Sequence, residues 1–378
     1  MELVTIFLAG ALASTPLYMT RLTLMGVPFY LPELFIIAGA LCWLTLVIRG
    51  QLQVSWPKLT VLLPVLVFVL GALISTVSAG SVAFGGLKSW VFFPALFGFL
   101  TIQLVAKSSK ARPILEKSLL VTAVVVALVG IGQEFWHLTR LSSFFNSPNA
   151  AAMWLVPVFF LVLPGRRSWF ERLGLLVIVV AIGLTKSFGG LSALAIGLAV
   201  YWFVGRLQTT RQEKILTGSL AGALGVFSLV SLTPILTNWA SQLFGVRLGG
   251  RAQIWTIART AVHDHILTGI GPGVFQSYYG ARIGLAFANP IEWSVPEPHN
   301  FYLATWLSSG LLGFVGLIWL IGALFYEQIK TRQPALVGAL VVIIVHGLVD
   351  TPYWKNDLSI IFFLIVALSA FQPLPKST

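Results

Sequence analysis

The chain has 378 residues, of which 57% are hydrophobic and only 10% are charged. Soluble domains carry about 25% charged residues, so this composition excludes a soluble protein and indicates an all-α polytopic membrane protein. In a soluble protein the net charge of +12 would suggest nucleic-acid binding. In a membrane protein, basic residues instead mark the cytoplasmic loops, so no nucleic-acid partner is expected.

Twelve apolar segments are candidates for membrane helices, which need roughly 17–25 apolar residues each. They lie near residues 3–19, 28–48, 59–79, 87–106, 115–136, 149–164, 171–186, 188–205, 216–236, 300–326, 334–351 and 357–373. The sixth to eighth segments are short, and the break near 186–188 is compatible with a turn inside the membrane. The sequence therefore predicts one membrane domain over residues 1–378, with about 12 transmembrane helices.

The basic residues are distributed unequally between the two sides of these spans. The links after even-numbered spans and the C-terminal tail hold 15 Lys and Arg residues, against 9 in the links after odd-numbered spans. The positive-inside rule therefore places both termini in the cytoplasm and the longest link, residues 237–299, outside. The chain has no G-x-x-x-x-G-K-[ST] motif, which argues against ATP-driven transport by this chain alone.

The outer loop contains an amphipathic helix over residues 249–266. An apolar stripe follows the helical period at Ile254, Ile257, Ala258, Ala261 and Val262. Arg251, Trp255 and Arg259 share another face, at positions i, i+4 and i+8. This pattern predicts a helix on the outer membrane surface with Trp255 at the interface. The two arginines either contact lipid phosphates or bind an anionic substrate.

Two shorter motifs in the loop favour structural interpretations. His263 and His265 are two residues apart, so on a helix they point in nearly opposite directions and do not predict a metal site. The segment GIGPGVF, residues 269–275, is rich in turn-forming residues. No strand precedes it, so a turn is a better interpretation than a phosphate-binding loop.

His299 stands immediately before the tenth span, where Asn300 is a candidate N-cap. The positive end of the helix dipole disfavours an imidazolium, so we expect a neutral ring with a lone pair that a general base needs. The alternative is an interfacial histidine that anchors the helix. Gly310 follows about 16 Å deeper along a continuous helix, where it and Gly313 predict close helix packing.

The pattern H-[NSQ]-x9-G-x-x-[GTV] is matched by His299, Asn300, Gly310 and Gly313. In this pattern the chain resembles the O-antigen ligase family of membrane glycosyltransferases, which includes O-antigen polymerase relatives. Four further segments are similar to that family: NSPNAAAMWLVP at 146–157 with Asn149, GGRAQIW at 249–255, GIGPGVF at 269–275 and HGLVD at 346–350 with Asp350. The resemblance implies a GT-C-like fold with a large outer loop between the ninth and tenth helices.

The resemblance also implies a function in lipopolysaccharide biosynthesis at the bacterial inner membrane. A glycan is carried on undecaprenyl pyrophosphate, an acceptor hydroxyl attacks its anomeric carbon, and the lipid pyrophosphate leaves. One displacement with one base predicts inversion, without a nucleotide sugar, metal or other cofactor. The implied base is His299 and the implied pyrophosphate ligand is Arg251. Candidates for further donor contacts are Lys186, Arg247 and Arg259.

The segment TKSFGG departs from the family pattern, because Phe188 stands where relatives carry an arginine. Lys186 is a candidate substitute, although lysine lacks the bidentate fork of arginine. It is equally consistent with an ordinary lysine at the end of a span. The other candidates are Arg21, Lys88 and Arg247. Asp350 is expected to pair with Lys355 or to orient an arginine.

Three functions remain open from the sequence. A ligase moves a finished glycan to lipid A core, a protein or another lipid, whereas a polymerase adds it to another lipid-linked repeat. The shared motif does not separate these two enzymes. A transporter or flippase of lipid-linked or anionic solutes would use the same arginines but would not need His299 as a base.

Overall fold

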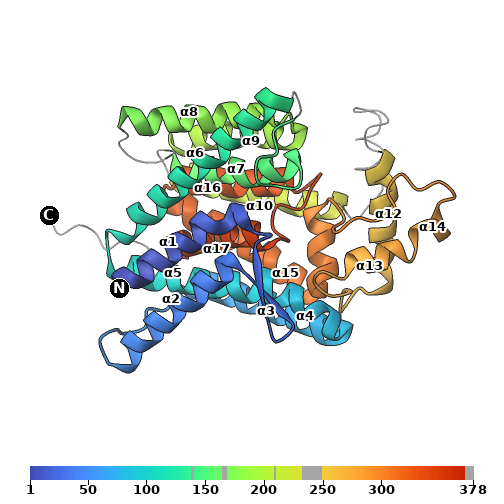
Figure 1. Ribbon diagram of the computed structural model, residues 1–378, viewed down its shortest axis with the longest axis horizontal. Helices are drawn as coiled ribbons and strands as arrows, with labels where there is room; N and C mark the ends of the chain where they lie inside the picture. The colour runs from blue at the N-terminus through green and yellow to red at the C-terminus, as the bar shows by residue number, and fades with distance from the viewer. Residues whose placement is uncertain (138–139, 164–167, 208–209, 232–248, 371–378) are drawn as a thin grey trace.

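The computed structural model describes residues 1–137, 140–163, 168–207, 210–231 and 249–370, which form helices and one short hairpin (Figure 1). A helix occupies each of the twelve apolar segments. These helices are α1 (Glu2–Ser14), α2 (Leu31–Ile48), α3 (Leu59–Ala79), α5 (Phe93–Lys107), α6 (Ala111–His137), α7 (Pro148–Val162), α8 (Trp169–Leu184), α9 (Phe188–Val204), α10 (Thr210–Ser231), α15 (Phe301–Lys330), α16 (Pro334–His346) and α17 (Asn356–Ala370). The predicted break after α8 is present.

Within the described residues, five helical stretches are long and apolar enough to cross a membrane. They are Leu31–Ile48, Leu59–Ala79, Ser81–Lys107, Ala111–Trp136 and Phe301–Lys330. Shorter apolar helices, including α7, α9, α16 and α17, accompany them. A mostly helical protein with several apolar helices is therefore confirmed, while twelve complete crossings remain a prediction.

The centre of the molecule is formed by α7, α16 and α17. Nearly every side chain of these helices is buried, as expected for helices that are apolar on all sides. Helix α16 packs against α9 and α7, and α17 packs against α5. The indole Nε1 of Trp154 in α7 donates to the Thr15 hydroxyl at 3.1 Å, so the N-terminal segment is tied to this centre.

The longest helix, α15, packs along α3. Its Gly313 meets Gly71 of α3, where a Cβ on Gly71 would lie 2.1 Å from the Gly313 amide nitrogen, so this position has no room for a side chain. Small residues allow this approach between membrane helices, and the packing predicted for Gly313 is confirmed. At the far end of both helices, Lys58 Nζ lies 2.6 Å from Glu327 Oε2 and Thr60 donates to Glu327 Oε1 at 3.0 Å.

Helix α15 is interrupted at Gly310, so the prediction of a continuous helix is wrong at this position. Gly310 has φ 63° and ψ −174°, a conformation that is almost exclusive to glycine. The interruption frees the Leu307 carbonyl, which accepts hydrogen bonds from the amides of Ile270 at 2.7 Å and Gly271 at 3.1 Å. The predicted turn of the outer loop, with positive φ at Gly271, is therefore docked directly onto α15.

The outer loop forms a group of helices at one end of the molecule (Figure 1). They are α12 (Gly249–Asp264), α13 (Phe275–Gly280) and α14 (Ile283–Ala286). The apolar stripe of α12 is buried as predicted, but it packs on protein, including Leu303 and Leu307 of α15. Trp255 is only 1% exposed, so its predicted position at the membrane interface is wrong. Trp255 is buried because its ring packs in an apolar cluster of the protein and its Nε1 donates to the carbonyl of His299.

The link between α1 and α2 folds into an antiparallel hairpin that the sequence did not predict. It consists of β1 (Arg21–Leu24) and β2 (Val27–Tyr30), joined by a turn with positive φ at Met25 and Gly26. A second link, between α3 and α5, contains the short helix α4 (Phe84–Leu87) and one π-helical turn, η3 (Lys88–Phe92). Both links contribute to a cavity described below.

Replacing Gly71 by alanine is expected to destabilise the protein by about 1–3 kcal/mol, because the new methyl group overlaps the backbone of Gly313 and overpacks the contact. Thermal denaturation of the purified protein checks this value. The control is Gly322→Ala in α15, where a Cβ meets nothing within 4 Å. Equal melting temperatures for the two variants would contradict the proposed packing.

Candidate functional site at the outer end of α15

His299 is held at the N-terminus of α15 by its neighbours. The Asn300 side chain accepts hydrogen bonds from the amides of Tyr302 at 3.1 Å and Leu303 at 3.0 Å, which confirms it as the N-cap. The other end of that side chain donates to the Leu348 carbonyl at 3.0 Å. His299 itself has φ 48°, a strained conformation for a residue with a Cβ. Its carbonyl accepts from Trp255 Nε1 at 3.3 Å, which ties this backbone to α12.

The His299 ring is paired with Asp350, which follows α16. Nδ1 of His299 lies 3.0 Å from Asp350 Oδ1, and the amide of Thr351 donates to the same oxygen at 3.0 Å. A carboxylate only accepts, so Nδ1 must carry the proton and Nε2 has the free lone pair of the neutral ring. The histidine side chain is 30% exposed and the aspartate only 3%. The exposed ring is thus oriented by a buried carboxylate.

Arg251 of α12 approaches the second oxygen of the same carboxylate. Its Nη2 lies 3.6 Å from Asp350 Oδ2, and its side chain is 22% exposed. Asp350 therefore joins Arg251 and His299, and the expected alternative of an ion pair with Lys355 is not what the structure shows. Two cationic or hydrogen-bonding partners offset the cost of burying this charge. A histidine, an aspartate and an arginine from three separate segments meet at one point.

Lys186 lies in a second polar cluster, at the junction of α8 and α9. Its Nζ is 2.9 Å from Glu134 Oε1, and its side chain is 58% exposed. Arg140 donates to the carbonyls of Thr185 at 2.9 Å and Lys186 at 3.2 Å, and to Asn149 Oδ1 at 3.1 Å. The cluster therefore contains two candidates from the sequence, Lys186 and Asn149. Arg140, which no motif indicated, adds a guanidinium.

The α8–α9 junction adjoins the segment that carries Asp350. A Cβ placed on Gly189, at the start of α9, would lie 2.8 Å from the His346 ring and 2.9 Å from Val349. Phe188, which replaces the expected arginine, is 61% exposed. The polar cluster of Lys186 and Arg140, called the cationic cluster below, is therefore on the α9 side of the His299 site.

The remaining cationic candidates differ in their surroundings. Lys88 is buried, with its Nζ bonded to Glu33 and to the Pro28 carbonyl at 2.7 Å, so it is not free to replace an arginine at Phe188. Arg21 lies exposed on β1. Arg259 is half-buried on α12, and burial lowers the pKa of its guanidinium. Arg247 lies outside the described residues. Within the described chain, no three His, Cys, Asp or Glu side chains form a metal-sized group.

The family model for O-antigen ligase matches residues 173–318. Over this segment the chain is similar to the O-antigen ligase family. The matched segment extends from α8 into α15 and includes Arg251, His299 and Gly310, whereas Asp350 lies outside it. No curated protein matches the chain. The match and the apolar helices support an O-antigen ligase/polymerase-like membrane protein, and the expected resemblance is confirmed over the matched segment.

Glu297 is a further ionisable group of the matched segment that the sequence reasoning missed. It precedes His299 by two residues, is 4% exposed, and its Oε1 is buried without a hydrogen-bond partner in the described residues. Burial raises the pKa of its carboxyl from 4.5 to about 8, although the neighbouring Lys355 opposes this shift. At neutral pH the group is therefore mainly protonated and uncharged.

The raised pKa of Glu297 makes stability depend on pH. The unfolded carboxyl ionises near pH 4.5 and the folded one near 8. Below pH 4.5 the carboxyl is protonated in both states, and its contribution to the free energy of unfolding is at its maximum. Between pH 4.5 and about pH 8 only the folded state keeps the proton, so the free energy of unfolding decreases by up to about 1.4 kcal/mol per pH unit. Glu297→Gln is expected to remove this loss, so its melting temperature should increasingly exceed that of the wild type between pH 5 and 8. The exposed Glu292→Gln is the control, and parallel curves for both variants would contradict the assignment.

Proposed function

We propose that this O-antigen ligase-like enzyme transfers a glycan from undecaprenyl pyrophosphate to an acceptor hydroxyl on the outer face of the inner membrane. The observation that carries the proposal is the His299–Asp350 pair, with Arg251 on the second carboxylate oxygen. A histidine that only anchored a helix end would not need a buried carboxylate to fix its tautomer. The positive-inside rule, with both termini in the cytoplasm, places this site outside.

His299 acts as the general base in the proposed reaction. Nε2 takes the proton of the acceptor hydroxyl while the oxygen attacks the anomeric carbon of the donor glycan. The bond from that carbon to the pyrophosphate oxygen breaks, and its electron pair leaves with the lipid pyrophosphate. One in-line displacement inverts the anomeric carbon. Asp350 accepts a hydrogen bond from Nδ1 and stabilises the imidazolium that forms, so it is a positioning residue.

Arg251 binds the leaving pyrophosphate in this proposal. Negative charge develops on that group during the displacement, and a positioned guanidinium stabilises it by charge-assisted hydrogen bonds. The Asp350 carboxylate orients Arg251 from one side, while the partly exposed guanidinium retains donors for a substrate. Lys186, Arg247 and Arg259 remain proposed donor contacts. The reaction as proposed uses no metal and no other cofactor.

A ligase and a polymerase share all of these steps and differ in the acceptor. For a ligase the acceptor is a glycan or lipid outside the donor pool, such as lipid A core. For a polymerase it is a second lipid-linked repeat. The residues around His299 support the chemistry that both enzymes have in common.

Transfer by the purified protein in lipid nanodiscs tests the proposal. The donor is a labelled oligosaccharide on undecaprenyl pyrophosphate, offered with lipid A core or a second lipid-linked repeat. We expect labelled product from the wild type and a loss of about 10²–10⁴-fold in kcat from His299→Ala, because the base is removed. Asp350→Asn is expected to lower kcat by about 10²-fold or more, because the amide no longer fixes the tautomer.

His263→Ala is the matched control, since His263 is exposed on the same loop and is expected to leave transfer unchanged. Full activity of His299→Ala would overturn the base assignment alone. No transfer by the wild type to either acceptor would overturn the glycosyltransferase proposal and favour a transporter.

Replacing Arg251 by alanine is expected to lower kcat/KM for the donor by about 10²–10³-fold, because a transition-state hydrogen-bond donor is lost. Arg251→Lys should recover only part of this activity, since lysine retains the charge but lacks the planar fork. Steady-state transfer kinetics measure both effects. The control is Arg282→Ala, an exposed loop arginine that stacks on Tyr278. A full recovery by lysine would show that charge alone suffices.

A further inference from the structure

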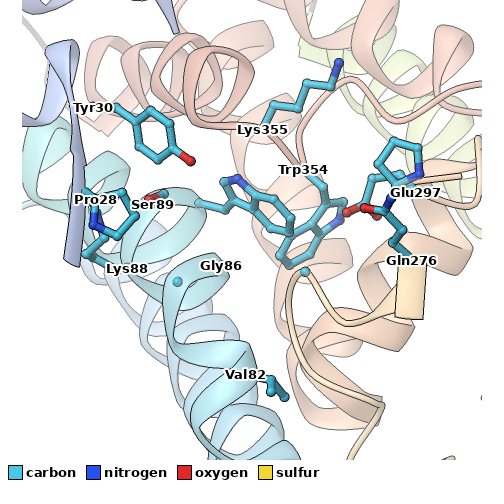
Figure 2. Close-up of a pocket in the computed structure, with 14 residues that line it drawn as sticks. Pro28, Tyr30, Val82, Gly86, Lys88, Ser89, Gln276, Glu297, Trp354 and Lys355 are labelled. Carbon is cyan, nitrogen blue, oxygen red and sulfur yellow. The ribbon is translucent and has the colours of Figure 1, made fainter. Parts of the chain in front are cut away.

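A cavity of about 300 Å³ lies between the outer links of the chain (Figure 2). Its size is at the lower end of small-ligand pockets, which span about 300–1,000 Å³. Its walls come from β2, from the α4 and η3 segment, from the turn and start of α13, and from the segments that precede α15 and α17. Each of these segments belongs to a link that the positive-inside rule places outside, or to the adjoining span end.

The cavity adjoins the His299 site along the chain. Glu297 lines it and precedes His299 by two residues, while Lys355 lines it and follows Asp350 by five residues. The same two segments therefore supply the cavity wall and the proposed base with its positioning carboxylate. A ligand in the cavity is held by the residues that flank the reactive pair.

Glu297 has a polar atom that needs a partner. Its Oε1 is buried and receives no hydrogen bond from the described residues, which is unfavourable for a buried polar group. Glu297 lines the cavity together with Gln276, and Figure 2 shows both side chains at the same end of it. Lys355, on the same wall, makes no ion pair within the described part of the chain. These groups offer hydrogen-bond donors and acceptors to a ligand.

Trp90 supplies an apolar wall. It is half-buried on η3, and its ring meets that of Trp354 at 6.2 Å and 74°. Lys88 also lines the cavity, but Glu33 already neutralises its charge, so Lys355 is the lining lysine that retains its charge for a ligand. An aromatic face beside several hydrogen-bonding groups matches a sugar ring, which has apolar C–H faces and a rim of hydroxyls.

The cavity and the cationic cluster are built from different elements. Lys186 and Arg140 lie at the α8–α9 junction, which meets the end of α16. The cavity is bounded by the hairpin, η3 and α13 instead. In Figure 1, α8 and α9 lie along the upper side of the molecule and α4 along the lower side. A donor pyrophosphate bound near Lys186 and Arg140 would not occupy the cavity. The cavity is then available to the acceptor.

We propose that this cavity binds the acceptor sugar, with its hydroxyls bonded to Glu297, Gln276 and Lys355 and a C–H face on Trp90. The inference rests on the proposed function and deepens it by assigning the acceptor a site. The protonated Glu297 carboxyl donates one hydrogen bond and accepts another, as a sugar hydroxyl requires. Bound in this position, an acceptor contacts Glu297, which precedes the proposed base His299 by two residues.

Saturation-transfer NMR on the protein in nanodiscs tests the assignment. The probes are the methyl glycosides of glucose, galactose, mannose and N-acetylglucosamine. We expect at least one to bind to the wild type, and Glu297→Ala and Trp90→Ala to reduce its signal at least fivefold. Glu297→Gln should retain most of the signal, because the amide also donates and accepts. The exposed loop residues Glu292→Ala and Trp293→Ala are matched controls that should bind as the wild type does.

Absence of binding by all four glycosides, or an unchanged signal in Glu297→Ala, would overturn the inference. If Trp90→Ala fails to fold, the comparison of Glu297→Ala with Glu297→Gln tests the inference by itself. His299→Ala should bind the glycoside normally while losing transfer. Glycoside binding without any transfer by the wild type would overturn the proposed function but keep the sugar site. Transfer without glycoside binding would overturn the sugar site but keep the proposed function.

The glycoside that binds then serves as the acceptor in the transfer assay. Glu297→Ala is expected to raise KM for this acceptor at least tenfold and to leave KM for the lipid-linked donor unchanged. A raised donor KM with an unchanged acceptor KM would show that the cavity holds the donor glycan and would overturn the acceptor assignment.

Discussion

The interruption of α15 at Gly310 fixes the position of the outer loop, and the candidate site depends on it. The free carbonyl of Leu307 accepts hydrogen bonds from two amides of the glycine turn, so the loop is docked by backbone hydrogen bonds. From this turn the chain leads back to α12, which places Trp255 against the His299 carbonyl and Arg251 against Asp350. The nine residues between Asn300 and Gly310 are thus the half-helix that joins the docking point to the proposed base.

Much of the fold could be predicted from the sequence because its signals are local. Apolar segments of sufficient length located the twelve helices, and Asn300 after Pro298 located the start of α15. Periodicity also found the buried stripe of α12, but it could not tell whether lipid or protein covers that stripe, so Trp255 was misplaced. The break at Gly310 was missed because glycine is compatible with both a close helix contact and an interruption.

The site was predicted in part. His299 and Arg251 follow from the family pattern, but their shared partner Asp350 is 51 residues from His299. That pairing depends on how α15 and α16 pack, which no local pattern records. Arg140 and Glu297 carried no motif at all. The only signal for Glu297 was an acidic residue between two prolines, which does not reveal burial.

The cavity draws its walls from four links, whereas His299, Asp350 and Arg251 are fixed by helix ends and a buried carboxylate. Two of these links also hold His299, Arg251 and Asp350, whereas the hairpin link and the α3–α5 link supply wall residues only. Substitutions in those two links can reshape the cavity while the helix ends that hold the histidine, the aspartate and the arginine stay intact.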